Sequence, residues 1–248
     1  MALAFQSPRF AGDAFLEDVL NDPDTGTKQV KKNSPVASVE AVQQAIFDLG
    51  IPQNYLEPPV VDETTFVDGD YGSATTNAVQ AYKKLNRIYF PPDGPIYSGA
   101  TDGLAGPRTL RKLDGHCVLF DEATTEINAK AADLTASGVQ AQVTDPLPTV
   151  VGRTPGAFSN AEIDGVDGGI WYRRGIGAFE VHGNILLKYI DLHHARAGEA
   201  LGFPINDEHD DGPGFRASDF EYGTLRCDLS SGVVDVLLNN SGITGVTF

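Results

Sequence analysis

The sequence has few cationic side chains and no long hydrophobic run. Lys and Arg total 18 against 34 Asp and Glu in 248 residues, which gives a net charge of −16. Binding to nucleic acid and to anionic membranes both depend on cations, so we expect neither as a partner. No stretch approaches the roughly 18 consecutive apolar residues that a transmembrane helix needs, so no membrane span is predicted.

Cysteine is also scarce, with only Cys117 and Cys227. A secreted disulfide scaffold would be far richer in cysteine, so we expect two unlinked thiols. No Cys/His spacing indicates a structural zinc, and no H-E-x-x-H or G-x-S-x-G motif is present. We therefore predict no metal, no cofactor and no catalytic residue, and lean against an enzyme. A glycosidase needs only two carboxylates at a set separation, so 34 acidic residues leave that alternative open.

The first ten residues lack the basic region and the long apolar core of a secretory signal, and Asp13, Glu17 and Asp18 follow at once. We expect a protein that is made in the cytoplasm without a cleaved signal. If it acts at a cell surface, another export route has to carry it there.

Hydrophobic residues make up 41% of the chain, enough for a core, and the length suits one large or two small domains. Apolar periodicity predicts helices over 10–22, 38–49, 73–86, 107–113 and 118–138. Ser38 is the expected cap of the second, and Gly50 with Pro52 its stop signal. On the helix over 73–86, Lys83 and Lys84 should face outward, whereas the apolar positions should face inward: Ala78, Val79, Tyr82 and Leu85. The segments 51–67 and 87–101 are predicted loops.

A D-G-x-x-G-x-x-T pattern occurs twice, from Asp68 to Thr75 and from Asp102 to Thr109. Asp-Gly permits a positive φ, the second glycine allows a tight entry, and the threonine falls in the first helical turn. Each copy therefore predicts a turn that leads into a helix.

The last ninety residues have a different character, with strands expected at 169–172 and 177–181 that pair as a hairpin. A helix over 183–195 and the loop Leu201-Gly202-Phe203-Pro204 follow, then an acidic run, Asp207–Asp211, which does not fit calcium-loop spacing and should be a solvated loop. Strand patterns return at 220–225 and 232–236, so one unit of about 54 residues occurs once and begins again. Residues 139–160 read as a linker or irregular strands.

The segment from Val39 to Leu113 resembles the peptidoglycan-binding-domain-1 family, a three-helix module. The match consists of a Gln-containing helix that ends in Leu-Gly, followed by the two D-G-x-x-G-x-x-T turns. Its residues are Val42-Gln43-Gln44-Ala45-Ile46 with Leu49-Gly50, then Asp68 to Thr75 with Ala78, Val79 and Tyr82, then Asp102 to Leu110 with Leu113. The resemblance implies binding of the cell wall. The loops at 51–67 and 87–101 depart from the compact pattern and either cover or rebuild the usual groove.

The segment from Gly168 to Val236 resembles the LGFP repeat of cell-wall-associated proteins. Matching residues are Gly169-Ile170-Trp171, Gly177-Ala178, Val181, Gly183, Ile185, Tyr189, Leu201 to Pro204, Asp207-Glu208, Phe220, Gly223 and Leu225. Residues 10–22 also look like the opening of peptidoglycan-binding-like proteins found beside phage-tail-like contractile injection systems. These resemblances imply association with the cell envelope and, for the leader, a route of export.

We therefore expect an α+β protein with a peptidoglycan-binding-like helical domain over 1–116, a helix and linker over 117–154, and an LGFP-repeat-like domain over 155–248. The expected function is non-catalytic binding of peptidoglycan or wall glycan. One version of this expectation is that the protein is cargo of a contractile injection system and contacts its tube or sheath proteins. A wall hydrolase or toxin effector and a structural adaptor are the alternatives.

Sugar rings stack on aromatic side chains, and Asp and Arg hydrogen-bond the polar groups of wall fragments. The candidate ligand-binding residues lie in the two turns, in the helix that follows the second, and in the strand that holds the single Trp: Asp70, Tyr71, Arg108, Arg111, Trp171 and Tyr172. Because the protein and many walls are both anionic, recognition should rest on short-range contacts and depend weakly on salt.

Overall fold

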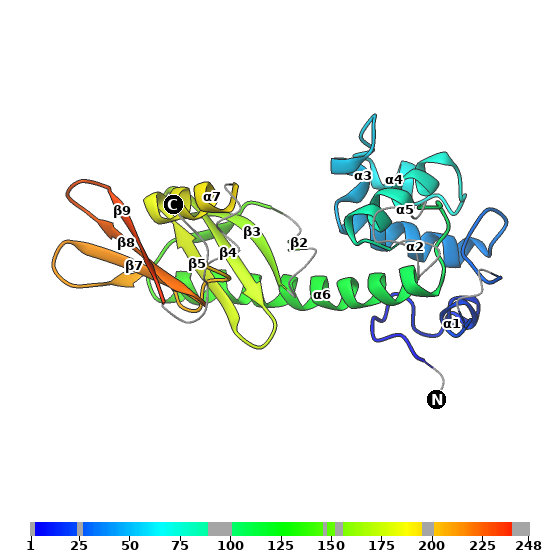
Figure 1. Ribbon diagram of the computed structural model, residues 1–248, viewed down its shortest axis with the longest axis horizontal. Helices are drawn as coiled ribbons and strands as arrows, with labels where there is room; N and C mark the ends of the chain where they lie inside the picture. The colour runs from blue at the N-terminus through cyan, green and yellow to red at the C-terminus, as the bar shows by residue number, and fades with distance from the viewer. Residues whose placement is uncertain are drawn as a thin grey trace. The chain divides into compact units, whose positions relative to one another are not determined.

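The computed structural model describes residues 3–23, 27–88, 101–145, 148–151, 156–194 and 201–239. The chain divides into two compact units, and the boundary between them falls at Asp121 and Glu122, inside one long helix. The described part of the first unit is helical, and the second contains antiparallel sheets and a helix, so the protein is α+β (Figure 1). No helix in the described ranges is both long and apolar enough to cross a membrane.

The first unit is built around one buried cluster. Its members include Phe10, Leu16, Ile46, Tyr82 and Leu110, each at most 1% exposed. Most members of the cluster lie on helices, although Phe10 precedes the first of them. These helices are α1 (Ala14–Leu20), α2 (Val36–Asp48), α3 (Ile51–Tyr55), α4 (Glu63–Phe66), α5 (Ser73–Leu85) and the start of α6 (Pro107–Ala136). Helix α5 begins and ends within one residue of its predicted bounds.

The cap predicted at Ser38 is wrong. Helix α2 begins at Val36, and the Ser38 hydroxyl instead donates a hydrogen bond to Oδ2 of Asp13 at 2.7 Å. The other carboxylate oxygen of Asp13 accepts two backbone N–H groups from the first turn of α1. One aspartate thus caps α1 and ties it to α2, an arrangement that local sequence does not indicate.

The loop predicted over 51–67 is wrong in part, because the segment contains the short helices α3 and α4 on either side of an irregular stretch, 56–62. Gly50 has a φ of +71°, which ends α2 and leads directly into α3. The segment stays on the core because Ile51 and Phe66 are only 5% and 2% exposed. The other predicted loop, 87–101, lies almost entirely outside the described residues.

Helix α6 is a single helix of 30 residues, not the two helices predicted over 107–113 and 118–138. Its buried positions continue across the expected gap at helical spacing: Leu110, Leu113, Cys117, Phe120, Ala123, Ile127, Ala131 and Leu134. An unbroken apolar stripe outweighs the low helix propensity of Gly115.

The second unit contains two antiparallel sheets. The first has the order β1 (Ala141–Val143), β3 (Gly156–Ile163), β4 (Val166–Arg173), β5 (Gly177–His182), with β2 (Thr149–Val151) also paired to β3. The second has the order β6 (His209–Asp210), β7 (Phe215–Phe220), β8 (Gly223–Asp228), β9 (Val234–Leu238). Of the helix and linker expected over 117–154, the helical part lies in α6, and the residues after it form the short strands β1 and β2, which is the second of the two alternatives given for 139–160.

The repeated hairpin of the sequence corresponds to β4–β5 and β8–β9, both antiparallel pairs. The pair β4–β5 matches the predicted hairpin. The prediction of one strand over 220–225 is wrong, because the chain turns at Glu221 and Tyr222 between β7 and β8. Helix α7 (Gly183–His194) packs on β4 and β5 and also on β8. It covers the upper face of the first sheet in Figure 1, and the C-terminal half of α6 runs along the opposite side.

The Leu-Gly-Phe-Pro segment is a structural corner of the second unit. Leu201 and Phe203 are 1% and 8% exposed, and Gly202 has a φ of +72°. The Gly202 carbonyl accepts the Tyr189 hydroxyl at 2.9 Å, and the amide of Phe203 donates to Oε2 of Glu221 at 2.9 Å. This motif therefore closes the core between α7 and the start of β8.

Candidate functional site

The first D-G-x-x-G turn is held by one buried glutamine. Gln43 is 0% exposed, and its Nε2 donates to Oδ1 of Asp68 at 2.8 Å, to the Asp70 carbonyl at 3.1 Å and to the Thr75 hydroxyl at 2.8 Å. Its Oε1 accepts the Gly69 amide at 2.9 Å, and Gly69 has the expected positive φ, +73°. The glutamine of α2 thus fixes the turn that begins α5.

The second turn packs against α5 itself. A Cβ at Gly103 would lie 2.2 Å from Cγ2 of Thr76 and 2.9 Å from its carbonyl oxygen. Asp102 forms an ion pair with Lys83, whose Nζ also donates to the Leu104 carbonyl at 3.2 Å. Lys83 is 5% exposed, so the prediction that it faces outward is wrong. Close approach, rather than positive φ, requires the glycine here.

Of the candidate ligand-binding residues in the first unit, Tyr71 is not available. It is 5% exposed, and its hydroxyl donates to the Gly103 carbonyl at 2.8 Å. Burial also raises its pKa above the ordinary tyrosine value. The prediction that Tyr71 stacks on a sugar ring is therefore wrong, because the tyrosine ring lies in the core beneath the two turns.

Asp70 and Arg111 are exposed and Arg108 is half-buried. Nε of Arg111 donates a hydrogen bond to the Pro107 carbonyl of the same helix, α6, at 3.3 Å. None of these three residues lines the pocket described below. The turns therefore position helices rather than gather a binding site.

The two aromatic candidates of the second unit are also buried, Trp171 at 8% and Tyr172 at 7% exposure. Trp171 stacks on Phe158 with ring centroids 5.8 Å apart and meets the edge of Tyr189 at 5.5 Å. Tyr172 points to the opposite face of the sheet, where its hydroxyl donates to Oε2 of Glu122 at 3.3 Å. The prediction that these two residues form an open stacking surface is wrong, because α7 and α6 cover the two faces of the sheet.

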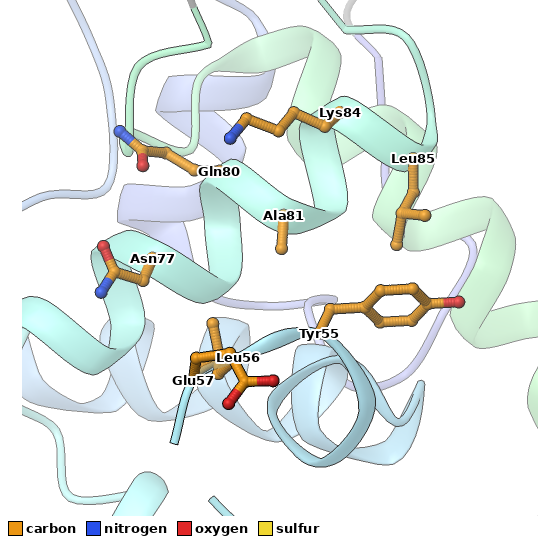
Figure 2. Close-up of a pocket in the computed structure, with 8 residues that line it drawn as sticks. All are labelled: Tyr55, Leu56, Glu57, Asn77, Gln80, Ala81, Lys84 and Leu85. Carbon is orange, nitrogen blue, oxygen red and sulfur yellow. The ribbon is translucent and has the colours of Figure 1, made fainter. Parts of the chain in front are cut away.

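A pocket of about 460 Å³ lies in the first unit between α5 and the end of α3 (Figure 2). The residues that line it are Tyr55, Leu56, Glu57, Asn77, Gln80, Ala81, Lys84 and Leu85. The rebuilt segment 51–67 supplies one wall, and α5 supplies the other. Two large apolar side chains are exposed at its edge, Tyr55 at 54% and Leu85 at 44%.

The pocket combines apolar carbon with unused polar groups. Leu56, Ala81 and Leu85 provide aliphatic surface. No hydrogen bond or ion pair joins the side chains of the five polar lining residues to another described residue: Tyr55, Glu57, Asn77, Gln80 and Lys84. Four of these five residues are exposed to solvent, so their polar groups are free to bond to a ligand that enters the pocket.

Sequence reasoning did not select these residues. Lys84 lies outward on α5 as predicted, but the prediction that Leu85 faces inward is wrong, because its side chain is 44% exposed at the edge of the pocket. The segment 51–67 was noted as one that could rebuild a groove. The missing information was that 51–67 folds into α3 and packs beside α5. Only that contact brings Tyr55 and Leu85 together.

The second unit contains a mostly buried cluster of charged groups. Nδ1 of His182 lies 2.7 Å from Oε2 of Glu180 and 3.5 Å from Oε2 of Glu208. Nε of Arg216 lies 3.3 Å from Oε1 of Glu208, and the Glu208 amide donates to Glu180 at 2.9 Å. The side chains of Glu180 and Glu208 are 4% and 9% exposed. The cluster joins β5 of one sheet to the segment around β6 and β7 of the other.

These contacts shift two pKa values. Burial lowers the pKa of His182, but its hydrogen bond to Glu180 and the charges of Glu180 and Glu208 outweigh burial, so the pKa lies above the ordinary 6.5. Burial raises the pKa of Glu208 above its ordinary 4.5, and Oε2 of Glu208 has no hydrogen-bond partner. Because the groups are enclosed and engaged with one another, the cluster serves as a structural link.

The acidic run is ion-paired rather than merely solvated. Asp207 pairs with Lys130 of α6, and Oδ2 of Asp211 lies 2.6 Å from Nε of Arg226. Within the described ranges, no group of three or more His, Cys, Asp or Glu side chains is arranged to hold a metal ion.

The two thiols are unlinked and buried, as expected. Burial raises the pKa of Cys117 to about 12 and lowers the pKa of its neighbour His116 to about 4, with the charge of Lys112 adding to the latter shift. His116 faces Tyr82, with Nδ1 3.2 Å from the hydroxyl. A thiol that stays protonated is a poor nucleophile.

No family model matches the chain, and no curated protein matches it. The likenesses of residues 39–113 and 168–236 to wall-binding modules therefore rest on the motifs alone.

Proposed function

We propose that this protein binds the cell wall without catalysing a reaction on it, and acts as a targeting or anchoring module. The observation that carries the proposal is the pocket between α3 and α5, where five polar side chains without internal partners surround aliphatic carbon. Fragments of peptidoglycan combine the same two properties, since their sugars and peptides carry many hydrogen-bonding groups on apolar frames.

The resemblance to the peptidoglycan-binding-domain-1 family supports the wall as the source of the ligand. Helices α2, α5 and the start of α6 would be the three helices of that module, with α3 and α4 inserted between the first two. Gln43 and the two glycine turns fix α5, which forms one wall of the pocket. We propose in the same way that the second unit is an LGFP-type domain.

Sedimentation with purified peptidoglycan tests the proposal. We expect the protein to pellet at moderate salt, and Tyr55→Ala to reduce the bound fraction about ten-fold, because it removes the exposed ring of the pocket. Tyr222→Ala is a matched control, since Tyr222 is 40% exposed in the second unit. No sedimentation of the wild-type protein would contradict the proposal.

Two further readouts separate the alternatives. Release of soluble muropeptides over hours would identify a wall hydrolase, and stable co-purification with a tube or sheath protein in place of wall binding would identify an adaptor. Because the protein carries a net charge of −16, wall binding should change little between 0.05 M and about 0.3 M salt. Strong loss over that range would indicate long-range electrostatic attraction instead.

Carriage by a contractile injection system is a separate part of the proposal. It is supported only by the likeness of residues 10–22 to leaders found beside such machines. In this chain Leu16, Val19 and Leu20 of α1 are at most 2% exposed. A contact with tube or sheath proteins would therefore use the exposed face of α1, and co-purification from cells that assemble such a machine tests it.

A further inference from the structure

The two walls of the pocket carry opposite charges. Lys84 lies on α5, whereas Glu57 follows α3 on the facing wall (Figure 2). Neither side chain forms an ion pair with another described residue, and the same holds for the exposed Lys31, Lys32 and Lys112, whereas Lys28, Lys83, Lys130 and Lys188 are paired. What distinguishes Lys84 from those lysines is its position, because it lines the same pocket as the acid Glu57 and both charges are free to meet a ligand there.

The neighbouring lysine shows what a structural role looks like on this helix. Lys83 is 5% exposed and binds both Asp102 and the Leu104 carbonyl, so it pins the second turn. Lys84 is one residue further along, and the helical rotation of about 100° turns it away from that turn. It lines the pocket, and its side chain runs along α5 toward Gln80 (Figure 2).

Two large side chains lie together at one end of the pocket. In Figure 2, the side chain of Leu85 points toward the ring of Tyr55, whereas Ala81 lies midway along α5 and Leu56 lies beside Glu57, nearer Asn77. The amides of Asn77 and Gln80 can each donate and accept a hydrogen bond, as a peptide group in a ligand requires. The pocket therefore offers aliphatic surface, amide groups and one charge of each sign.

We infer that this pocket binds the peptide stem of the wall rather than its glycan strand, with a stem carboxylate at Lys84 and a stem amine at Glu57. Stem peptides carry both charges together with short alkyl side chains and peptide groups, whereas the N-acetylated sugars of the glycan strand bring neither an amine nor a free C-terminal carboxylate. This inference rests on the proposed function and names the part of the wall that the pocket recognises.

Calorimetric titration with four soluble probes tests the inference. The probes are a synthetic stem pentapeptide with a free lysine amine and a free C-terminal carboxylate, the same peptide as its C-terminal amide, the same peptide with its amine acetylated, and chitotetraose. We expect the free peptide to bind most tightly. Each blocked peptide should bind about three- to five-fold more weakly, as expected for one exposed ion pair, and chitotetraose should be the weakest.

Two variants that each remove one charge show which pocket residue binds which end of the peptide. Lys84→Met should abolish the preference for the acid over the C-terminal amide and keep the preference for the free amine. Glu57→Gln should have the reverse effect. Lys112→Met removes an exposed lysine that does not line the pocket and should behave as the wild type. Because Lys84 and Glu57 are exposed, far-UV circular dichroism should be unchanged in both variants.

The outcomes distinguish this inference from the function on which it rests. Tighter binding of chitotetraose than of the peptide, or equal weakening of all probes by Lys84→Met, would overturn the peptide-stem assignment. If the protein sediments with intact wall in a Tyr55-dependent manner but binds none of the peptides, wall binding stands and the stem assignment fails. If it neither sediments nor binds the peptides, both fail.

Discussion

The hydroxyl of Tyr71 donates a hydrogen bond to the carbonyl of Gly103 at 2.8 Å, and so joins the two D-G-x-x-G turns. The two residues are 32 positions apart, and the tyrosine ring is 5% exposed. One turn begins α5 and the other begins α6, so this bond sets the two helix starts against each other. The sequence repeat therefore has a structural purpose, because each copy of the turn packs on the other.

Tyr71→Phe should destabilise the first unit by about 1–2 kcal/mol, because it leaves a buried carbonyl without its donor while keeping the ring in place. The variant should still bind peptidoglycan as the wild type does. Urea unfolding followed by circular dichroism at 222 nm reports mainly on helix, and the fluorescence of Trp171, the single tryptophan, reports on the second unit. A loss of wall binding in folded Tyr71→Phe would instead restore a ligand role for this tyrosine.

Gly103→Ala and Gly115→Ala should have opposite effects on the stability of the first unit. A Cβ at Gly103 would lie 2.2 Å from a side-chain atom and 2.9 Å from the backbone of Thr76, so we expect a loss of about 2 kcal/mol or more. A Cβ at Gly115 meets nothing within 4 Å, and alanine favours helix, so a gain of about 0.5–1 kcal/mol is expected. Equal effects in urea unfolding would show that the second turn is not tightly packed on α5.

Gln43→Ala should destabilise the first unit by about 2–4 kcal/mol, since it removes a fully buried side chain and strands the Gly69 amide inside the turn. Gln44→Ala is the control. The neighbouring glutamine is half-buried and donates only to Asp48, at 2.8 Å, one helical turn away, so the expected change is below about 0.5 kcal/mol. The same urea transition at 222 nm measures both, and the Trp171 transition should not move in either variant.

The second unit should lose stability as the pH rises from about 6 toward 8. The pKa of His182 is higher in the folded protein than its ordinary 6.5, so the protonated imidazole stabilises the fold below that value, and this contribution disappears as the pH passes the folded pKa. The raised pKa of Glu208 acts in the same direction, because ionising a buried carboxyl costs stability as the pH rises above 4.5. The urea midpoint of Trp171 fluorescence, measured at several pH values, checks the slope.

His182→Gln isolates the histidine part of that slope. The glutamine can still hydrogen-bond Glu180 but does not titrate, so the midpoint should become flatter between pH 6 and 8. His209→Gln, at a histidine whose side chain is 42% exposed, should leave the slope as in the wild type. A wild-type midpoint that rises over this range would show that the imidazole in the cluster is neutral.

Much of the local structure was predictable because it depends on short-range signals. The bounds of α5, the hairpin β4–β5 and helix α7 follow from apolar spacing and from glycine and proline positions. The errors are equally physical. Two predicted helices merged into α6 because one apolar stripe continues past Gly115, and a predicted loop became α3 because Ile51 reaches the core.

The candidate site was less predictable than the fold. Tyr71, Trp171 and Tyr172 are residue types that bind sugars when exposed, but each is at most 8% exposed here. Tyr172 illustrates the reason, because what covers its face of the sheet is α6, whose Glu122 lies 50 positions earlier in the chain. The exposure of an aromatic side chain depends on such distant neighbours.

By itself, the sequence determined the mixed helical and sheet character, the two turns that begin α5 and α6, and the strong acidity. These properties follow from composition and from interactions within a few residues. Tertiary structure alone decided which aromatics are buried and where a ligand can enter. The pocket exists because Tyr55 and Glu57 at the end of α3 face Lys84 and Leu85 on α5, and a contact across some thirty residues is set by packing rather than by local propensity.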